Sequence, residues 1–202
     1  MKSFKQISVI GAGSWGTAVA NLLAAKGLKV LLWGRDQEQV AIMQKTRKNP
    51  RYLTDLKLEK NLIFSADLQE AVTFADLVVM AVPSMAMRLT MLKIKPFLKQ
   101  KSYFLSLTKG LEEHSCLSMS EVIADVAGPG SKVAALSGPN HAEEVSQKIP
   151  SATVIASLDE EYSRALQELF LTSYFRVYTN TDIKGVEIAG ATKNVIAIAA
   201  GV

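Results

Sequence analysis

Three glycines near the start of the chain have the spacing of a dinucleotide-binding loop. Gly11, Gly13 and Gly16 follow a strand-like apolar run and open a helix-like run, inside a βαβ unit of about 30 residues. Gly11 permits a tight turn, Gly13 lets a pyrophosphate approach the backbone, and Gly16 allows close packing of helix on strand. The anion then lies among free N–H groups at the helix N-terminus. The pattern predicts a pyrophosphate site; glycines that serve only a turn are the alternative.

The end of the second expected strand bears on which dinucleotide is bound. In NAD-binding proteins this strand ends in a carboxylate that hydrogen-bonds the ribose 2′-hydroxyl. Here Gly34, Arg35 and Asp36 follow the strand. With Gly34 at that position, the Arg35 guanidinium can pair with a 2′-phosphate, so NADP(H) is accepted. Asp36 can instead cap the next helix, which leaves use of NAD(H) open as well.

Three further segments follow expected strands at the same edge of the sheet. Pro83 lies in the loop after one expected strand, and Lys109 follows a second one. A Gly-Pro-Asn turn that contains Gly138 and Asn140 follows a third. Ligands of open α/β sheets bind at the carboxyl ends of the strands. On this ground a functional role for Lys109 is as plausible as a merely solvated one.

Lys193 lies inside an otherwise apolar helical run. An ammonium there is costly unless it is paired or its pKa falls, and a lysine of lowered pKa suits proton transfer. A surface lysine whose amine reaches water is the alternative. His114, His141 and Cys116 have no spacing typical of a nucleophile or a metal site, and we assign them no role.

The elements that must position these residues alternate between short β-rich runs and longer amphipathic runs. This pattern predicts an α/β, Rossmann-like, doubly wound fold with a mostly parallel sheet and helices on both faces. Asp36 and Asp67 are expected to cap helices, and Gly27 to end the first one. About eight strands are expected, at residues 7–10, 30–33, 62–64, 77–82, 103–107, 133–136, 152–156 and 176–178.

Residues 1–182 read as one dinucleotide-binding domain, without repeats or linkers. From Asp182 onward the residues are small and apolar, and the helical run has no final capping signal. We therefore expect residues 183–202 to begin a helical C-terminal domain of which the rest is absent. A C-terminal helix docked on the sheet is the alternative.

Composition excludes several classes of protein. The 202 residues are 49% hydrophobic and 21% charged, which is ordinary for a globular chain. The net charge of +4 suits a nucleotide or sugar phosphate and does not require nucleic acid. One cysteine excludes an internal disulfide and fits the cytoplasm, and no apolar run is long enough for a membrane span. The basic stretch 45–52 is interpreted as a solvated face or a loop on the cofactor side.

Several separated motifs together resemble bacterial-type glycerol-3-phosphate dehydrogenases, the NAD(P)-dependent enzymes of glycerophospholipid synthesis. The resemblance covers essentially the whole chain. The motifs are Gly11–Ala18, Trp33–Arg35, Ala81–Ser84, Thr108–Leu111, Ser137–Glu144, Gly185–Glu187 and Lys193–Ile198.

The resemblance implies reversible hydride exchange between NADP(H) or NAD(H) and dihydroxyacetone phosphate, which gives sn-glycerol 3-phosphate. It also implies a role for individual residues. Lys193 is then the proton acceptor, and a lysine in this role needs a pKa near neutrality. The substrate would meet Lys109, Gly138, Asn140 and Lys193, and the cofactor would meet Gly11, Gly13, Ser14, Trp15, Gly16, Arg35, Pro83, Lys109 and Ala142. No metal is implied.

The chain departs from the family pattern at Asn140, where serine is common, and at Ile188–Thr192, ahead of the lysine. The family also keeps an Arg-Asn pair for the substrate phosphate, and an acidic partner for the lysine, in a C-terminal helical domain. We therefore expect this chain to bind dinucleotide with little dehydrogenase activity. A homodimer is expected from the apolar final helix. Another β-hydroxyacid-type dehydrogenase and a non-catalytic dinucleotide-binding module are the alternative functions.

Overall fold

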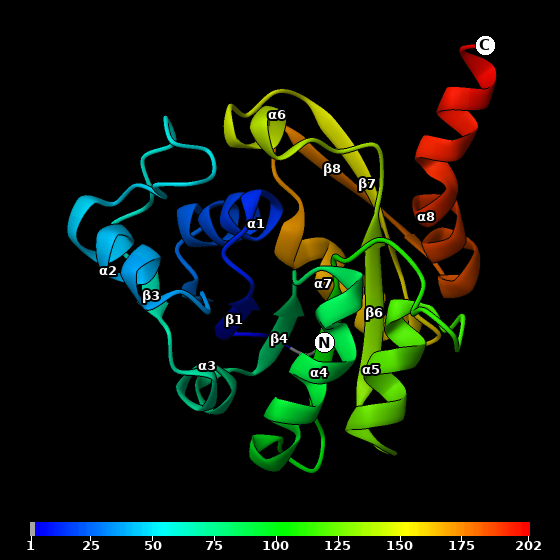
Figure 1. The fold of residues 1–202 in the computed structure, drawn as a ribbon, viewed down its shortest axis with the longest axis horizontal. Coiled ribbons are helices and arrows are strands. Elements are labelled where there is room, and N and C mark those ends of the chain that lie inside the picture. The colour runs from blue at the N-terminus through cyan, green and yellow to red at the C-terminus, as the bar shows by residue number, and fades with distance from the viewer. Residues whose placement is uncertain (1–2) are drawn as a thin grey trace.

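A computed structural model describes residues 3–202 and contains one eight-stranded sheet (Figure 1). The strand order is β3-β2-β1-β4-β5-β6-β7-β8, and all neighbours are parallel except β6 and β7. The chain order reverses beside β1, which makes the carboxyl ends of β1 and β4 a switch point where ligands bind. The strands are β1 Gln6–Ile10, β2 Lys29–Trp33, β3 Ile63–Ser65, β4 Leu77–Met80, β5 Tyr103–Ser106, β6 Lys132–Ser137, β7 Ser151–Ala156 and β8 Phe175–Asn180.

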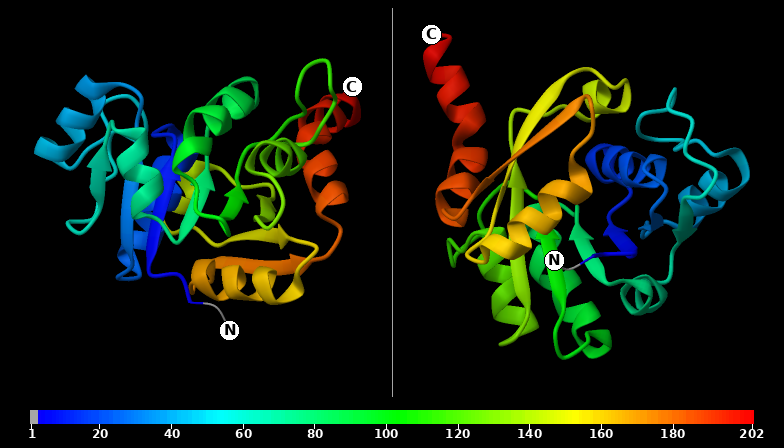
Figure 2. Two further views of the ribbon diagram at one scale, coloured as in Figure 1. Left: turned by 90° about the horizontal axis from the view of Figure 1, so that it is seen from below. Right: turned by 180° about the vertical axis from the view of Figure 1, so that it is seen from behind.

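Helices cover both faces of the sheet, as the alternating pattern predicts (Figure 2). Alternate β1 residues serve the two layers: Ile7 and Val9 join one apolar cluster, and Ile10 joins the other. Helices α1, α2, α6 and α7 pack on the first face, and α3, α4 and α5 on the second. Their bounds are α1 Ser14–Ala25, α2 Gln37–Thr46, α3 Leu68–Phe74, α4 Ser84–Ile94, α5 Met119–Ala127, α6 Ala142–Ser146 and α7 Glu160–Phe170, with a short 3-10 helix at Lys95–Phe97.

The α/β fold class and all eight expected strands are confirmed, with differences of a few residues at their ends. The expected strand 77–82 ends at Met80, because the next residues turn back toward the glycine loop. The expected caps are confirmed as well, since Asp36 and Asp67 accept backbone N–H groups at the starts of α2 and α3. In the part of the chain that the structure describes, no helix combines the length and hydropathy needed to span a bilayer.

The last helix, α8 (Ile183–Ala200), contacts β6 and β7, and its end projects away from the sheet (Figure 1). Asp182 caps it by accepting the Gly185 N–H at 2.8 Å. Glu187 is the residue of α8 that is buried, whereas Val195, Ile196 and Ile198 are exposed. The assignment of residues 183–202 to a separate helical domain stays a prediction.

Candidate functional site

The glycine loop joins β1 to α1 and lies against the loop after β4. Gly11 has a φ of +125°, and a Cβ there would come within 2.5 Å of the Ala81 carbonyl oxygen. A Cβ at Gly16 would lie 1.9 Å from the Gly11 carbonyl oxygen. The expected roles of Gly11 in a tight turn and of Gly16 in close packing are therefore confirmed.

Gly13 differs from the other two glycines because it faces open space. A Cβ added there meets no atom within 4 Å. Gly13 is also the N-cap of α1 and has no side chain to accept the first N–H groups of that helix. The loop therefore presents backbone donors and the positive end of the helix dipole to an open surface, which is the environment that a pyrophosphate requires.

Asn49 holds this loop from behind, and the sequence analysis missed that role. The asparagine is completely buried, and its Nδ2 donates to the Ala12 carbonyl oxygen at 3.1 Å and to Thr17 Oγ1 at 2.9 Å. Gln39 Nε2 donates to the same carbonyl oxygen at 3.1 Å and to Asn49 Oδ1 at 2.9 Å. An asparagine before a proline usually signals only a helix end, so the sequence offered no specific signal for this contact.

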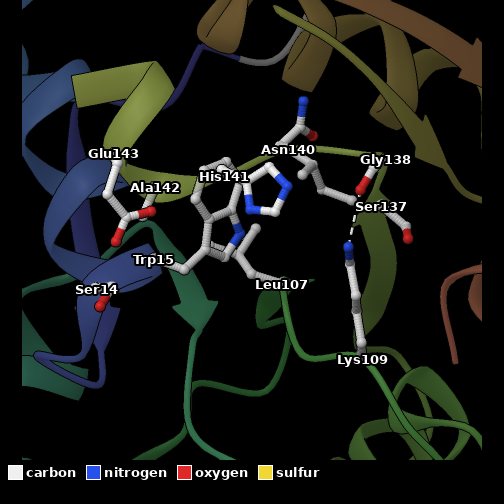
Figure 3. A pocket seen from close by; sticks show the side chains of 11 residues that line it. Ser14, Trp15, Leu107, Lys109, Ser137, Gly138, Asn140, His141, Ala142 and Glu143 are labelled. Atoms are coloured by element: carbon white, nitrogen blue, oxygen red, sulfur yellow. Dashed lines mark hydrogen bonds between the residues drawn. The ribbon is translucent and has the colours of Figure 1, made fainter. Parts of the chain in front are cut away.

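A pocket of about 330 Å³ opens beside the start of α1, at the carboxyl ends of β5 and β6 (Figure 3). Ser14 and Trp15 line it from α1, and Lys109 lines it from the loop after β5. The structure thus brings predicted cofactor residues and predicted substrate residues into one hollow. The full lining is Ser14, Trp15, Leu107, Lys109, Leu136, Ser137, Gly138, Asn140, His141, Ala142 and Glu143.

Lys109 crosses the pocket toward the loop after β6 (Figure 3). Its Nζ donates to the Gly138 carbonyl oxygen at 2.8 Å. Partial burial lowers the pKa of Lys109 from its usual value, and the nearby ammonium of Lys193 lowers it further. The segment before the lysine is fixed by Thr108 Oγ1, which donates to the Val82 carbonyl oxygen at 2.6 Å.

Asn140 contacts the start of β7 through its side-chain amide. Its Nδ2 donates to the Ala152 carbonyl oxygen at 2.7 Å, whereas its Oδ1 is buried without a hydrogen-bond partner in the described chain. The amide thus ties the loop after β6 to β7.

Lys193 is placed by the packing of α8. One turn earlier, Gly190 lies so close to the sheet that an added Cβ would be 2.3 Å from Ser137 Oγ and 3.7 Å from Lys109 Cγ. A turn earlier again, Glu187 accepts hydrogen bonds from Ser118 Oγ at 2.6 Å, from Ser120 N at 2.8 Å and from Ser120 Oγ at 2.5 Å. These contacts dock α8, and Lys193 on this helix lies near enough to Lys109 to lower its pKa.

The remaining predicted residues lie outside the lining of this pocket. Lys193 is half-buried on α8, and its charge lowers the pKa of Lys109, which does line the pocket. Pro83 is exposed at the start of α4, and Arg35 is exposed after β2. His141, to which we assigned no role, does line the pocket as the N-cap of α6. Among residues 3–202 no group of three or more His, Cys, Asp or Glu could hold a metal ion.

A family model for the N-terminus of NAD-dependent glycerol-3-phosphate dehydrogenase matches residues 6–163. The chain is 47% identical over 198 residues to a glycerol-3-phosphate dehydrogenase [NAD(P)+] of Carboxydothermus hydrogenoformans, covering 98% of this chain and 59% of that protein. It is 42% identical over 199 residues to the Staphylococcus aureus protein of the same name, with coverages of 98% and 60%. The chain thus spans about three fifths of the length of these curated relatives.

Solved structures agree with these relatives. The glycerol-3-phosphate dehydrogenase of Coxiella burnetii superposes with a TM-score of 0.91 at 38% identity, over 97% of this chain and 60% of that one. The Saccharomyces cerevisiae glycerol-3-phosphate dehydrogenase superposes with a TM-score of 0.87 at 29% identity, over 97% of this chain and 62% of that one.

Proposed function

Because the chain belongs to the NAD-dependent glycerol-3-phosphate dehydrogenase family, we propose that it binds NAD(P)(H) and takes part in the reversible reduction of dihydroxyacetone phosphate to sn-glycerol 3-phosphate. Glycerophospholipid synthesis uses this product. The observation that carries the proposal is the pocket in which Ser14 and Trp15, at the start of α1, meet Lys109 and Asn140. A dinucleotide on the glycine loop would extend directly into this hollow.

The loop and its neighbours are assigned to the cofactor. Backbone groups at Gly11, Gly13 and Gly16 and the uncapped start of α1 support a pyrophosphate site. The open space at Gly13 supports a close approach of the anion. We assign the other cofactor contacts to Ser14, Trp15, Arg35, Pro83, Lys109 and Ala142.

The far side of the pocket is assigned to the substrate. Lys109 and the loop that carries Gly138 and Asn140 would hold dihydroxyacetone phosphate, since all three residues line this pocket. NAD(P)(H) held by these residues would supply the hydride chemistry at C2 of the substrate. Lys193 donates a proton to the oxygen on C2 during reduction and accepts it during oxidation. Burial, and next the nearby ammonium of Lys193, lowers the pKa of Lys109 beside it.

The first experiment tests dinucleotide binding with a Gly13→Asp variant. Asp is a favoured N-cap, so the variant keeps α1, but its carboxylate would face the pyrophosphate. In fluorescence titrations we expect the dissociation constants of NADPH and NADH each to rise more than about tenfold. Ala25→Asp adds the same charge at the exposed other end of α1 and should change neither constant. Unchanged binding by Gly13→Asp would refute the assigned site.

Dihydroxyacetone phosphate is then added to the saturated NADPH complex. The pocket lining in the described chain holds one cation, Lys109, and a single ammonium is a weak anchor for a phosphate. We therefore expect the NADPH fluorescence to stay nearly constant. A decay at an enzyme-like rate, lost in Lys193→Met, would mean that these residues suffice for turnover.

The proposal extends to assembly and location. Val195, Ile196 and Ile198 are 67%, 62% and 70% exposed on α8, and an exposed apolar face of this kind supports a homodimer. The single free thiol, on the exposed Cys116, suits the reducing cytoplasm, which we propose as the location.

A further inference from the structure

The turn after α2 brings a second arginine to the end of β2. Asn49 Oδ1 accepts the backbone N–H groups of Arg51 at 3.1 Å and of Tyr52 at 3.2 Å. The same asparagine is bonded through Nδ2 to the glycine loop at Ala12. The backbone at Arg51 is therefore fixed relative to the dinucleotide site by a completely buried residue.

Arg51 forms an ion pair with Asp36, the carboxylate nearest to the position from which NAD-binding proteins hydrogen-bond the ribose 2′-hydroxyl. Arg51 Nη2 lies 2.5 Å from Asp36 Oδ2. Asp36 Oδ1 already accepts the N–H groups of Glu38 at 3.0 Å and of Gln39 at 3.1 Å. These backbone hydrogen bonds and the Arg51 guanidinium lower the pKa of Asp36, so it stays ionised and paired. Both carboxylate oxygens already have partners, so a 2′-hydroxyl would compete with Arg51 for Oδ2.

Positive charge exceeds negative charge at this place. Arg35, next to Asp36, is exposed and has no ion pair or hydrogen bond within the described residues. The Arg51 side chain is 55% exposed, and one contact to Asp36 leaves most of its five N–H donors unused. Gly34 adds no side chain, since a Cβ there would already lie 3.1 Å from Val40 and 3.2 Å from Ala12. The guanidinium groups of Arg35 and Arg51 thus accompany a single carboxylate, Asp36, whose negative charge is offset by its ion pair with Arg51.

We infer that Arg51 joins Arg35 in binding the 2′-phosphate of NADP(H), and that the chain consequently prefers NADP(H) to NAD(H). The inference rests on the proposed dinucleotide function and goes further by naming a specificity residue on the loop after α2. Arg51 acts in two ways, by donating to the phosphate and by neutralising Asp36, which would otherwise repel it.

The test compares dissociation constants of NADPH and NADH for the 202-residue chain and for Arg51→Gln. We expect Arg51→Gln to weaken NADPH about tenfold and to leave NADH within about twofold, because one charge-assisted contact is lost. Arg164→Gln removes an exposed arginine on α7 that is 3.7 Å from Glu160, and should change neither constant. Arg51→Lys keeps the charge on the loop and should lose a smaller factor.

Combining Arg51→Gln with Asp36→Asn separates the two effects of Arg51. Asn also caps helices, so α2 is retained, and circular dichroism checks the fold of each variant. We expect the double variant to regain only part of the NADPH affinity. Full recovery would overturn direct phosphate binding by Arg51. Equal changes for NADPH and NADH in Arg51→Gln, or no change in either, would overturn the role of Arg51. A wild-type chain that binds NADPH no more tightly than NADH would overturn the preference, whereas one that binds neither dinucleotide would refute the proposed function itself.

Discussion

The segment between β5 and α5, which carries Lys109, is held by a bidentate ion pair. Arg88 Nε lies 2.7 Å from Glu112 Oε1, and Arg88 Nη2 lies 2.9 Å from Glu112 Oε2. Ser115 Oγ donates to the same carboxylate at 2.6 Å, and Arg88 Nη1 also contacts Asp125 at 2.5 Å. One arginine on α4 therefore ties the lysine-bearing segment to α5.

The Arg88 guanidinium and the Ser115 hydroxyl lower the pKa of Glu112 from 4.5 to about 2. A lowered carboxyl pKa stabilises the fold fully above about 4.5, and this stabilisation disappears as the pH falls through about 2. In Arg88→Gln we expect the pKa of Glu112 to return toward 4.5. A carbon-13 NMR titration of the side-chain carboxyl measures this. An unshifted titration in the variant would mean that Arg88 is not the cause.

At the scale of the element, the docking of α8 depends on one carboxylate. Glu187 is 6% exposed and accepts three hydrogen bonds from the start of α5. The charge there also meets the positive end of the α5 dipole. Lys193 belongs to the same helix, so the Glu187 contact helps to hold the helix that carries this lysine against the sheet.

Replacing Glu187 by Leu leaves Ser120 N and two hydroxyls without their acceptor, which costs about 3 kcal/mol. We expect α8 to lose protection in amide hydrogen exchange. The pKa of Lys109 should rise in the same variant, because both burial and Lys193 lower it in the docked state. Glu168→Leu, an exposed change on α7, is the control. Retained protection of α8 with an unchanged Lys109 pKa would contradict this role.

At the scale of the whole molecule, apolar side chains remain in contact with water at one end. Val195 and Ile198 lie three residues apart on α8 and are 67% and 70% exposed. Burying such side chains on association stabilises a dimer in proportion to the apolar area removed from water. The proposed dimer interface therefore lies on the same helix as Lys193.

We expect light scattering of the chain to give a mass that rises with concentration toward a dimer. The double variant Val195→Glu and Ile198→Glu should remain monomeric, because it places two charges in the apolar face. Leu158→Glu changes a side chain that is 84% exposed elsewhere on the surface and should not alter the mass. A monomeric wild-type chain at every concentration would rule out this interface.

Local patterns were sufficient for the elements and for much of the site. Most strands are short runs rich in apolar residues, and each of the caps Asp36 and Asp67 lies next to the helix that it starts. The glycine loop was predicted because its motif, the preceding strand and the following helix are contiguous in the chain. Lys109 and Asn140, which the sequence predicts at one edge of the sheet, line a common pocket, and their contact with substrate stays a prediction.

What the sequence by itself determined is therefore what neighbouring residues decide: the α/β class, the eight strands, the helix caps and the turn that can receive a pyrophosphate. The tertiary structure alone decided the reversed β7, the buried contact of Asn49 with Ala12, the pairing of Arg51 with Asp36 and the anchoring of α8 by Glu187. These contacts join segments far apart in the chain, and their energy depends on burial and on the geometry of two partners. Burial and partner geometry are both undefined until the sheet has brought those segments together, so the sequence alone could not predict these contacts.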